Sequence, residues 1–160
     1  LPNGKECFRE VVRHPGAVCI VPITTEGEVI LVRQYRYPHK DVLLEIPAGK
    51  LEAGERENEQ TIAEAALREL REEVGVTPER FTYIGALYPS VAILDEVIFT
   101  YLAEGLEFGE TSPDEDEFLE TVKIPLDELC EMIVRGDIPD AKTQAGVLKA
   151  AYILEKRKNK

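Results

Sequence analysis

Apolar and polar residues in the first part of the chain follow the two-residue period of β-strands. Residues 16–24 are almost entirely apolar, and residues 28–35 alternate between two faces after a short turn, as the strands of a hairpin do. A third apolar run at residues 42–46 meets Pro47-Ala48-Gly49, which cannot continue a strand ladder. We therefore expect three strands and then a loop that lasts to about Gln60.

The period then changes to that of a helix. Thr61-Ile62-Ala63-Glu64 fits a capping box, in which the threonine hydroxyl and the glutamate carboxylate satisfy amides of the first turn. Gly75 is placed for a left-handed C-terminal cap. The sequence thus predicts a helix over residues 61–74 with an apolar stripe, made of Ile62, Ala63, Ala66, Leu67, Leu70 and Val74.

Strand-like composition returns in three further runs, at residues 81–88, 96–103 and 118–124. Two helices are predicted after them. Residues 126–135 carry apolar side chains on one face and stop at Gly136, and Asp140 is placed to cap a helix that runs towards residue 155. Strands interspersed with helices predict a mixed α/β or α+β fold, and the length of 160 residues predicts one domain over residues 1–160.

The charge balance narrows the choice of partners. Nineteen basic and 31 acidic side chains give a net charge of −12, which repels nucleic acid backbones and anionic membrane surfaces. We therefore expect neither nucleic acid nor a membrane as a partner. A phosphate-containing substrate would need a metal ion to reverse the local charge.

The cysteine content and the apolar runs bear on the cellular compartment. Three cysteines are an odd number in a chain large enough to fold without disulfides, which favours reduced thiols. The longest unbroken apolar stretch, residues 17–23, is too short to cross a bilayer, and the sequence does not open with a charged and then apolar leader. We expect a cytoplasmic protein.

Three carboxylates are crowded near the end of the predicted helix. Glu69 and Glu73 are four residues apart and Glu72 is three from Glu69, so we expect them on one face opposite the apolar stripe. Like charges at this spacing oppose the helix, as does the negative end of its dipole. One explanation is a solvated face relieved by Arg68 and Arg71. The other is a site for Mg²⁺ or Mn²⁺, which prefer oxygen ligands.

The segment that holds these carboxylates resembles a known signature. Residues 68–76 match the second half of the pattern G-x5-E-x7-R-E-U-x-E-E-x-G-U of the Nudix hydrolases, in which U is aliphatic. The first half fits from Gly49 to Glu55, but Glu55 and Arg68 are thirteen positions apart instead of eight. We place the five extra residues in an inserted loop, residues 56–60.

A competing register of the signature remains open. Residues 54–60 keep the usual spacing to Arg68 but put Gln60 where the pattern has glutamate. We prefer the register with Glu55 because it keeps the glutamate.

Further stretches resemble the ADP-ribose pyrophosphatase branch of the Nudix hydrolases. They are LPNGK at 1–5, HPGAV at 14–18, RQYR at 33–36, EIPAGK at 45–50 and DAKT at 140–143. This resemblance implies a Nudix-type α/β/α sandwich around a mixed sheet, and a homodimer. In relatives, strands before LPNGK exchange across the dimer, and we expect the present sequence to be without them. It also has SVAILDE at 90–96 where relatives have SPGFSDE, so the loop that lines their substrate pocket must differ.

The resemblance also implies roles for single residues at a metal site. Glu69 and Glu73 match the two main metal ligands, Glu72 matches the third, and the carbonyl of Ala48 matches a backbone ligand. Arg68 matches the position that orients these carboxylates through a charge-assisted pair, with Glu55 as the first choice of partner.

Substrate contacts are implied on the second and third predicted strands. Arg36 and Gln34 match the region that contacts the diphosphate and the terminal ribose, although a surface ion pair is the alternative for Arg36. Glu45 is expected to hydrogen-bond either the substrate or an arginine.

The proton acceptor is expected on an acidic segment. Carboxylates that bind cations are poor bases, whereas a glutamate on a loop can close over bound substrate. By the resemblance we assign Glu115 as the base, and Glu117 as an auxiliary metal ligand or alternative base.

Together these features indicate a Mg²⁺-dependent enzyme, with Mn²⁺ as the alternative ion, acting on a nucleotide sugar. By resemblance it cleaves the diphosphate of ADP-ribose, or of a similar nucleoside diphosphate sugar, by attack of water on phosphorus, and ADP-ribose gives AMP and ribose 5-phosphate. Alternatives are another nucleotide substrate, or a catalytically silent domain that binds a nucleotide or a protein. The intact set of Arg68, Glu69, Glu72 and Glu73 argues against a silent domain.

Overall fold

The first apolar run forms β1 (Ala17–Ile23), a fully buried strand in the middle of the sheet. The computed structural model describes residues 1–109 and 120–158. β1 runs parallel to β6 (Ile98–Phe108) and antiparallel to both β2 (Glu28–Arg36) and the short β4 (Ala48–Lys50). The sheet is therefore mixed, as predicted.

The remaining elements extend and cover this sheet. Over the described residues the strand order is β3-β2-β1-β6-β5, with β4 also paired to β1 and β7 to β2. These elements are β3 (Asp41–Glu45), a 3-10 turn (Glu55–Glu57), α1 (Glu59–Val74), β5 (Val76–Leu87), β7 (Glu120–Pro125), α2 (Leu126–Arg135) and α3 (Ala141–Lys158).

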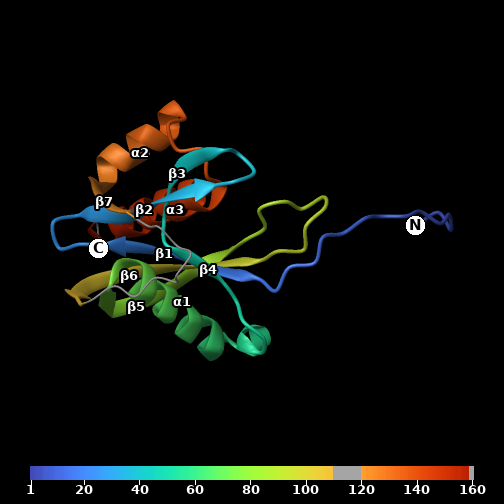
Figure 1. Cartoon of the computed structure of the whole chain (residues 1–160), viewed down its shortest axis with the longest axis horizontal. Coiled ribbons are helices and arrows are strands. Elements are labelled where there is room, and N and C mark those ends of the chain that lie inside the picture. Colours follow the sequence, from blue (N-terminus) through green and yellow to red (C-terminus); the bar gives the residue numbers. More distant parts are fainter. Residues whose placement is uncertain (110–119, 159–160) are drawn as a thin grey trace.

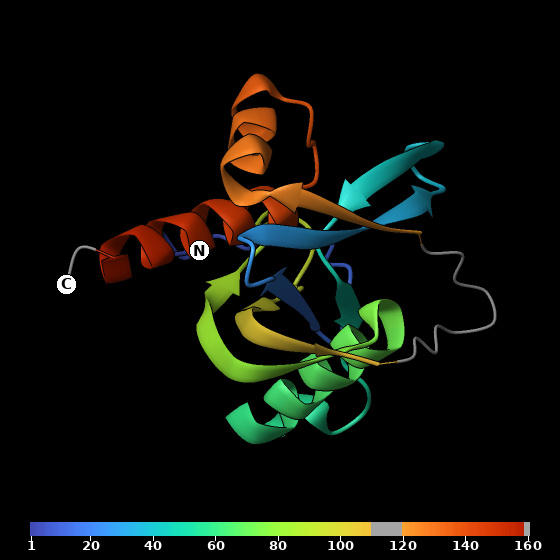
Figure 2. The ribbon, with the colours of Figure 1, turned by 90° about the vertical axis from the view of Figure 1, so that its left-hand side faces the viewer.

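Helices cover both faces of the sheet (Figures 1 and 2). Alternate residues of β1 point to opposite faces: Val18 packs into the core with α1, and Cys19 packs into the core with α2 and α3. Two separate apolar cores result, one on each face. The predicted α/β/α sandwich is confirmed.

The start of α1 differs from the prediction. Asn58 is the N-cap, and its side chain accepts hydrogen bonds from the amides of Gln60 and Thr61. Thr61 already lies inside the helix, where its hydroxyl donates to the backbone carbonyls of Glu55 and Asn58. The capping box predicted at residues 61–64 is therefore wrong, because an asparagine three residues earlier caps the helix instead.

This earlier start changes the account of the extra residues. They do not form an open loop over residues 56–60. They complete the 3-10 turn, supply the cap Asn58 and begin α1 at Glu59. β4 also occupies part of the predicted loop, because its backbone pairs with β1.

The C-terminal helices follow the predictions closely. α2 ends at Arg135, as predicted, and Gly136 after it adopts the left-handed conformation. The carboxylate of Asp140 accepts hydrogen bonds from the amide and the hydroxyl of Thr143, which caps α3.

β5 and β6 are longer than predicted because they pair with each other along almost their whole length.

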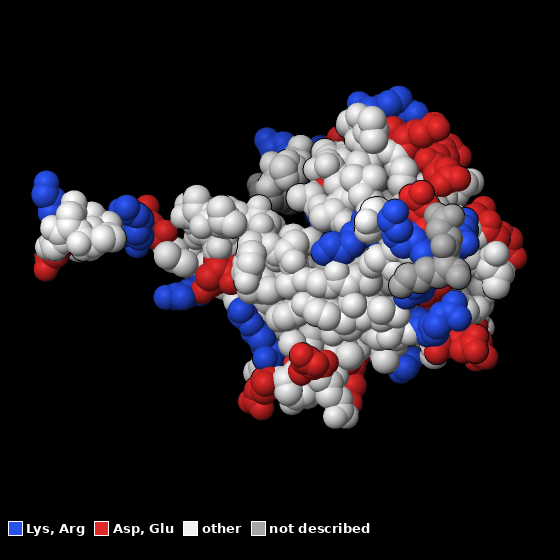
Figure 3. All heavy atoms as spheres, turned by 180° about the vertical axis from the view of Figure 1, so that it is seen from behind, with Lys and Arg blue, Asp and Glu red and all other residues white. Residues whose placement is uncertain are grey.

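The residues before β1 form an arm that stands clear of the body (Figures 1 and 3). Val12 forms an isolated parallel bridge with Leu94, and Asp95 binds Arg13 and the amide of His14. The arm and the segment it pairs with expose several apolar side chains, namely Phe8, Val11, Val12, Val91 and Ile93. None of the helices in residues 1–109 and 120–158 has the length and apolar character needed to cross a membrane.

Candidate functional site

A cleft of about 720 Å³ opens at the start of β1, between α1, β4 and the first turn of α3. It gathers six of the site residues predicted from the sequence, although they come from three elements, β2, β4 and α1: Gln34, Arg36, Ala48, Arg68, Glu69 and Glu72. Glu45 and Glu73 are buried beside it. The structure thus brings together both predicted groups, the carboxylates and the strand residues.

A larger cleft lies at the other end of β1. Its volume is about 1060 Å³, and it contains none of the predicted residues. There Glu104 bridges Arg80 and Arg157, with oxygen-to-nitrogen distances of 3.0 and 2.6 Å. Because these charges compensate one another, the smaller cleft is the better candidate.

The three carboxylates of α1 differ in their surroundings. Glu73 is only 4% exposed and accepts a 3.0 Å hydrogen bond from the amide of Ala48. The carboxylate of Glu69 lies against Gly49, so a Cβ atom at this position would force that carboxylate to move. Glu72 is partly exposed. The expected single face opposite the apolar stripe is therefore wrong for Glu73, which faces the protein interior.

Arg68 lies among these carboxylates. Its Nη1 is 2.7 Å from Glu69 Oε1 and 3.2 Å from Glu72 Oε2, and its Nη2 is 3.4 Å from both oxygens of Glu55. Partial burial lowers the pKa of the guanidinium, but the charges of Glu69, Glu55 and Glu72 outweigh burial and raise it above its usual value. Arg68 thus offsets the repulsion between the carboxylates.

The position of Glu55 bears on the two registers of the signature. Glu55 lies beside Arg68 and also accepts a hydrogen bond of 2.6 Å from the amide of Glu52. Gln60, the competing residue, is exposed in the first turn of α1 and donates to Glu64. This geometry favours the register with Glu55.

The donor atoms around Arg68 suit a hard divalent cation. They are carboxylate oxygens of α1 together with the backbone of β4 at Ala48, and oxygen is the ligand type that Mg²⁺ and Mn²⁺ prefer. Within residues 1–109 and 120–158, no three acidic, histidine or cysteine side chains are already gathered around one point that could hold an ion. The chemistry of these donor atoms therefore fits a divalent cation, although the carboxylates are not arranged around one point here.

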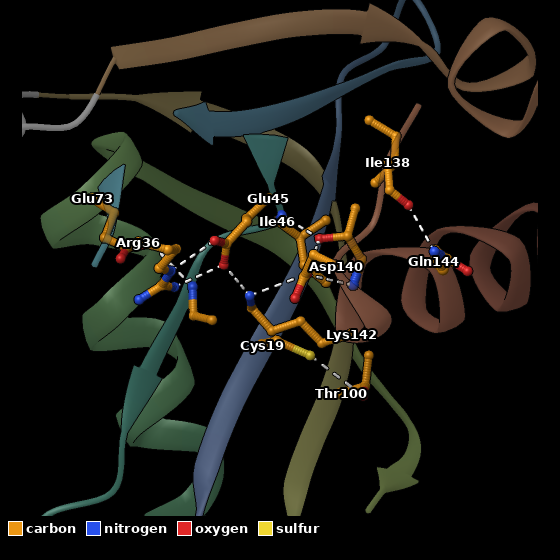
Figure 4. A network of polar contacts seen from close by, with 12 residues as sticks. Cys19, Arg36, Glu45, Ile46, Glu73, Thr100, Ile138, Asp140, Lys142 and Gln144 are labelled. Atoms are coloured by element: carbon orange, nitrogen blue, oxygen red, sulfur yellow. Dashed lines mark hydrogen bonds and ion pairs between the residues drawn. The ribbon is translucent and has the colours of Figure 1, made fainter. Parts of the chain in front are cut away.

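Arg36 and Glu45 belong to a second polar network (Figure 4). Arg36 binds Glu45 in a bidentate pair, with Nε and Nη2 each 2.7 Å from a carboxylate oxygen. Lys142 also donates to Glu45, from the opposite side. Burial favours the neutral carboxyl of Glu45, but Arg36 and Lys142 outweigh it and hold its pKa below the usual value. The hydrogen bonds that Arg36 donates to Glu45 raise the pKa of the Arg36 guanidinium.

Of the two expectations for Glu45, the structure realises the contact with an arginine. The side chain is 2% exposed, and both of its oxygens are used by Arg36 and Lys142. Direct contact with substrate is not available to it in this arrangement. Glu45 instead holds Arg36, which lines the cleft.

Several residues of the cleft were not assigned a role in the functional site from the sequence. They are His14, Pro89, Glu96, Asp140 and Lys142. His14 and Lys142 lie in stretches that resemble relatives, which was the available signal, but nothing in those stretches distinguished them from structural positions. His14 Nδ1 lies 3.4 Å from Glu96 Oε1 and accepts from the amide of Gly16.

Glu115 and Glu117 lie outside the described residues, so their assignment stays a prediction. The described chain resumes at Glu120, which pairs with Arg33 of β2. Arg33 Nε lies 3.9 Å from Glu120 Oε2, and Arg33 directly precedes Gln34 of the cleft.

The chain resembles known proteins along most of its length. Residues 12–147 match the family model described as NUDIX domain. The chain is 46% identical over 145 residues to an ADP-ribose pyrophosphatase of Bacillus subtilis (strain 168), covering 89% of this chain and 76% of that protein. It is 42% identical over 149 residues to a methanol dehydrogenase activator of Bacillus methanolicus, covering 92% and 78%. A solved ADP compounds hydrolase superposes with a TM-score of 0.77 at 27% identity, covering 89% of this chain and 74% of that one.

Proposed function

This chain belongs to the Nudix family, and we propose that it hydrolyses the diphosphate of ADP-ribose, or of a similar nucleoside diphosphate sugar. With ADP-ribose the products are AMP and ribose 5-phosphate. One observation supports the proposal: carboxylates of the signature helix line the same cleft as Arg36 and Gln34 of β2. A diphosphate with sugars on both sides needs both groups of residues. The carboxylates hold the metal ion that offsets the charge on its phosphates, and Arg36 and Gln34 orient it.

Divalent metal ions are in general use among Nudix hydrolases. Here Glu69, Glu72 and Glu73, with the carbonyl of Ala48, would hold Mg²⁺ or Mn²⁺. When bound, the ion neutralises the charge on the phosphates and lowers the pKa of coordinated water. This resolves the conflict between an anionic substrate and a chain of net charge −12.

The side chains then have distinct roles. Arg68 orients the carboxylates through its contacts with Glu55, Glu69 and Glu72. Arg36 and Gln34 bind the diphosphate and the terminal ribose, because both line the cleft and Arg36 is held there by Glu45. Glu115 accepts the proton of the attacking water, with Glu117 as the alternative.

The proposal is tested with a panel of nucleotides. The purified chain is incubated with Mg²⁺ and ADP-ribose, other nucleoside diphosphate sugars or nucleoside triphosphates. A phosphatase added afterwards releases phosphate from monophosphate products. We expect the largest release from ADP-ribose, with AMP as a product by chromatography. Absence of products from every nucleoside diphosphate sugar would contradict the proposal.

A second candidate substrate within the same panel is another nucleotide. The observation that favours it is the divergent stretch at residues 90–96, because Pro89 and Glu96 at its two ends both line the cleft. A preference for a triphosphate would support this alternative.

An alternative function of a different class is binding to a partner enzyme. It is favoured by the 42% identity to a relative named as an activator of methanol dehydrogenase. Stimulation of a dehydrogenase by a variant that hydrolyses no nucleotide would support a purely binding role.

Binding of the metal has a consequence for stability. Mg²⁺ or Mn²⁺ at millimolar concentration should raise the melting temperature, because the folded chain offers a site that the unfolded chain lacks. The rise should be smaller in Glu73→Gln. Glu64→Gln, an exposed change of equal charge on the same helix, should respond like the parent. Scanning calorimetry measures these shifts, and a parent melting temperature that Mg²⁺ does not change would contradict the metal site.

We also infer a homodimer in the cytoplasm. The apolar side chains exposed on the arm and on its pairing segment, among them Phe8 and Val91 at 95% and 86% exposure, support an interface with a second copy. The three free cysteines support a reducing compartment. A single monomeric species in analytical ultracentrifugation would contradict the dimer, and loss of activity in a reducing buffer would contradict the compartment.

A further inference from the structure

Lys142 lies in the first turn of α3, in a position that is unusual for a lysine. It lines the cleft but is only 9% exposed, and its ammonium group contacts the carboxylates of Glu45 and Asp140, the latter at 3.1 Å. A buried ammonium is costly unless such partners compensate it. The charge of Lys142 is therefore directed at Glu45 and Asp140.

Glu45 connects Lys142 to Arg36. One of its oxygens accepts from Arg36 Nε, and the other accepts from both Arg36 Nη2 and Lys142. The planar guanidinium can satisfy this bidentate pair in one orientation. The position of Glu45 thus sets the direction in which Arg36 presents its remaining donors to the cleft (Figure 4).

The first turn of α3 also forms a hydrogen bond with Ile46, the residue that follows Glu45. The hydroxyl of Thr143 accepts a 2.9 Å hydrogen bond from the amide of Ile46 and donates to Asp140 at 2.6 Å. Adjacent residues, Glu45 and Ile46, are therefore both held by α3. Because the helix start is fixed by Asp140, Lys142 approaches Glu45 from a defined direction.

We propose that Lys142 is a positioning residue for substrate binding, which fixes the guanidinium of Arg36 towards the cleft through the shared carboxylate of Glu45. The inference deepens the proposed function and rests on it. Without Lys142 the carboxylate is no longer held from α3 and moves with Arg36, so the arginine samples several orientations. Substrate binding weakens, whereas the bond-breaking step at α1 is unaffected.

A double-mutant cycle tests this role. Lys142→Met should raise KM for the best nucleoside diphosphate substrate about tenfold with kcat within about twofold of the parent. In an Arg36→Ala background the same change should alter KM by less than about twofold, because there is no guanidinium left to position. Lys142→Arg should retain most of the parent KM. Lys149→Met, an exposed change on the same helix, serves as the matched control.

A second measurement does not depend on turnover. The Nε–H of Arg36, assigned in ¹⁵N spectra by its loss in Arg36→Ala, should exchange slowly with solvent in the parent, because it is bonded to Glu45. It should exchange faster in Lys142→Met. If that variant does not fold, Lys142→Gln, which keeps a polar side chain at the buried position, replaces it in both measurements, with the same expected loss of the Arg36 orientation.

The outcomes separate the two proposals. Equal increases of KM in both backgrounds, or an Arg36 signal unaffected by the loss of Lys142, would overturn the positioning role. A parent chain that hydrolyses no nucleotide would overturn the proposed function alone, because the exchange of the Arg36 signal still decides the role of Lys142.

Discussion

Replacing Glu69 or Glu73 by glutamine should lower kcat/KM by about 10³-fold or more, the largest effects we expect in this protein. Glutamine keeps the shape of the side chain but removes the charge that a divalent cation requires. Turnover of the best substrate of the panel at saturating Mg²⁺ measures the loss. Glu64→Gln on the exposed side of α1 is the control and should stay near the parent.

The same substitutions should not destabilise the metal-free protein. Glutamine at position 73 can still accept the hydrogen bond from the amide of Ala48, so the buried contact survives. At position 69 the change removes a negative charge four residues from Glu73, which relieves repulsion within the helix. Melting temperatures without metal should equal or slightly exceed that of the parent. Near-parent turnover in either variant would show that the assigned ligands are wrong.

The repetitive elements were predictable because local pattern determines them. The apolar stripe of α1 and the glycines that end α1 and α2 carry enough information to locate these helices. The N-terminus of α1 was not predicted, because Asn58 and Thr61 are both good caps and lie three residues apart. Which of the two residues caps the helix depends on the 3-10 turn, in which the carbonyl of Glu55 accepts a hydrogen bond from the Thr61 hydroxyl.

The candidate site was predictable only where the resemblance to relatives assigned a role to a residue. The burial of Glu73 depends on Ala48, which lies 25 residues earlier in the chain. The contact of Lys142 with Glu45 spans 97 residues. No local pattern encodes such pairs, since each requires that two distant elements meet at the same end of the sheet.

The second large effect is expected from Glu115, in the acidic segment between β6 and β7. The carboxylates of the cleft that lie on α1 are already committed: Glu69 and Glu72 contact Arg68, and Glu73 contacts the amide of Ala48. Carboxylates that then bind cations lose basicity. The proton of the attacking water needs another acceptor, and the acidic segment is joined directly to Glu120, whose partner Arg33 is next to Gln34 of the cleft.

Glu115→Gln should therefore lower kcat by about 10²-fold or more while KM and the affinity for Mg²⁺ stay close to the parent values, because the lost interaction forms only in the transition state. Steady-state kinetics with a Mg²⁺ titration measures all three quantities. Glu117→Gln is the matched comparison, two residues away and equal in charge. If Glu117→Gln is inactive and Glu115→Gln is near the parent, the two roles are exchanged. If both variants are active, the acceptor is a carboxylate of the cleft itself, and Glu72, the most exposed of those on α1, becomes the next residue to replace.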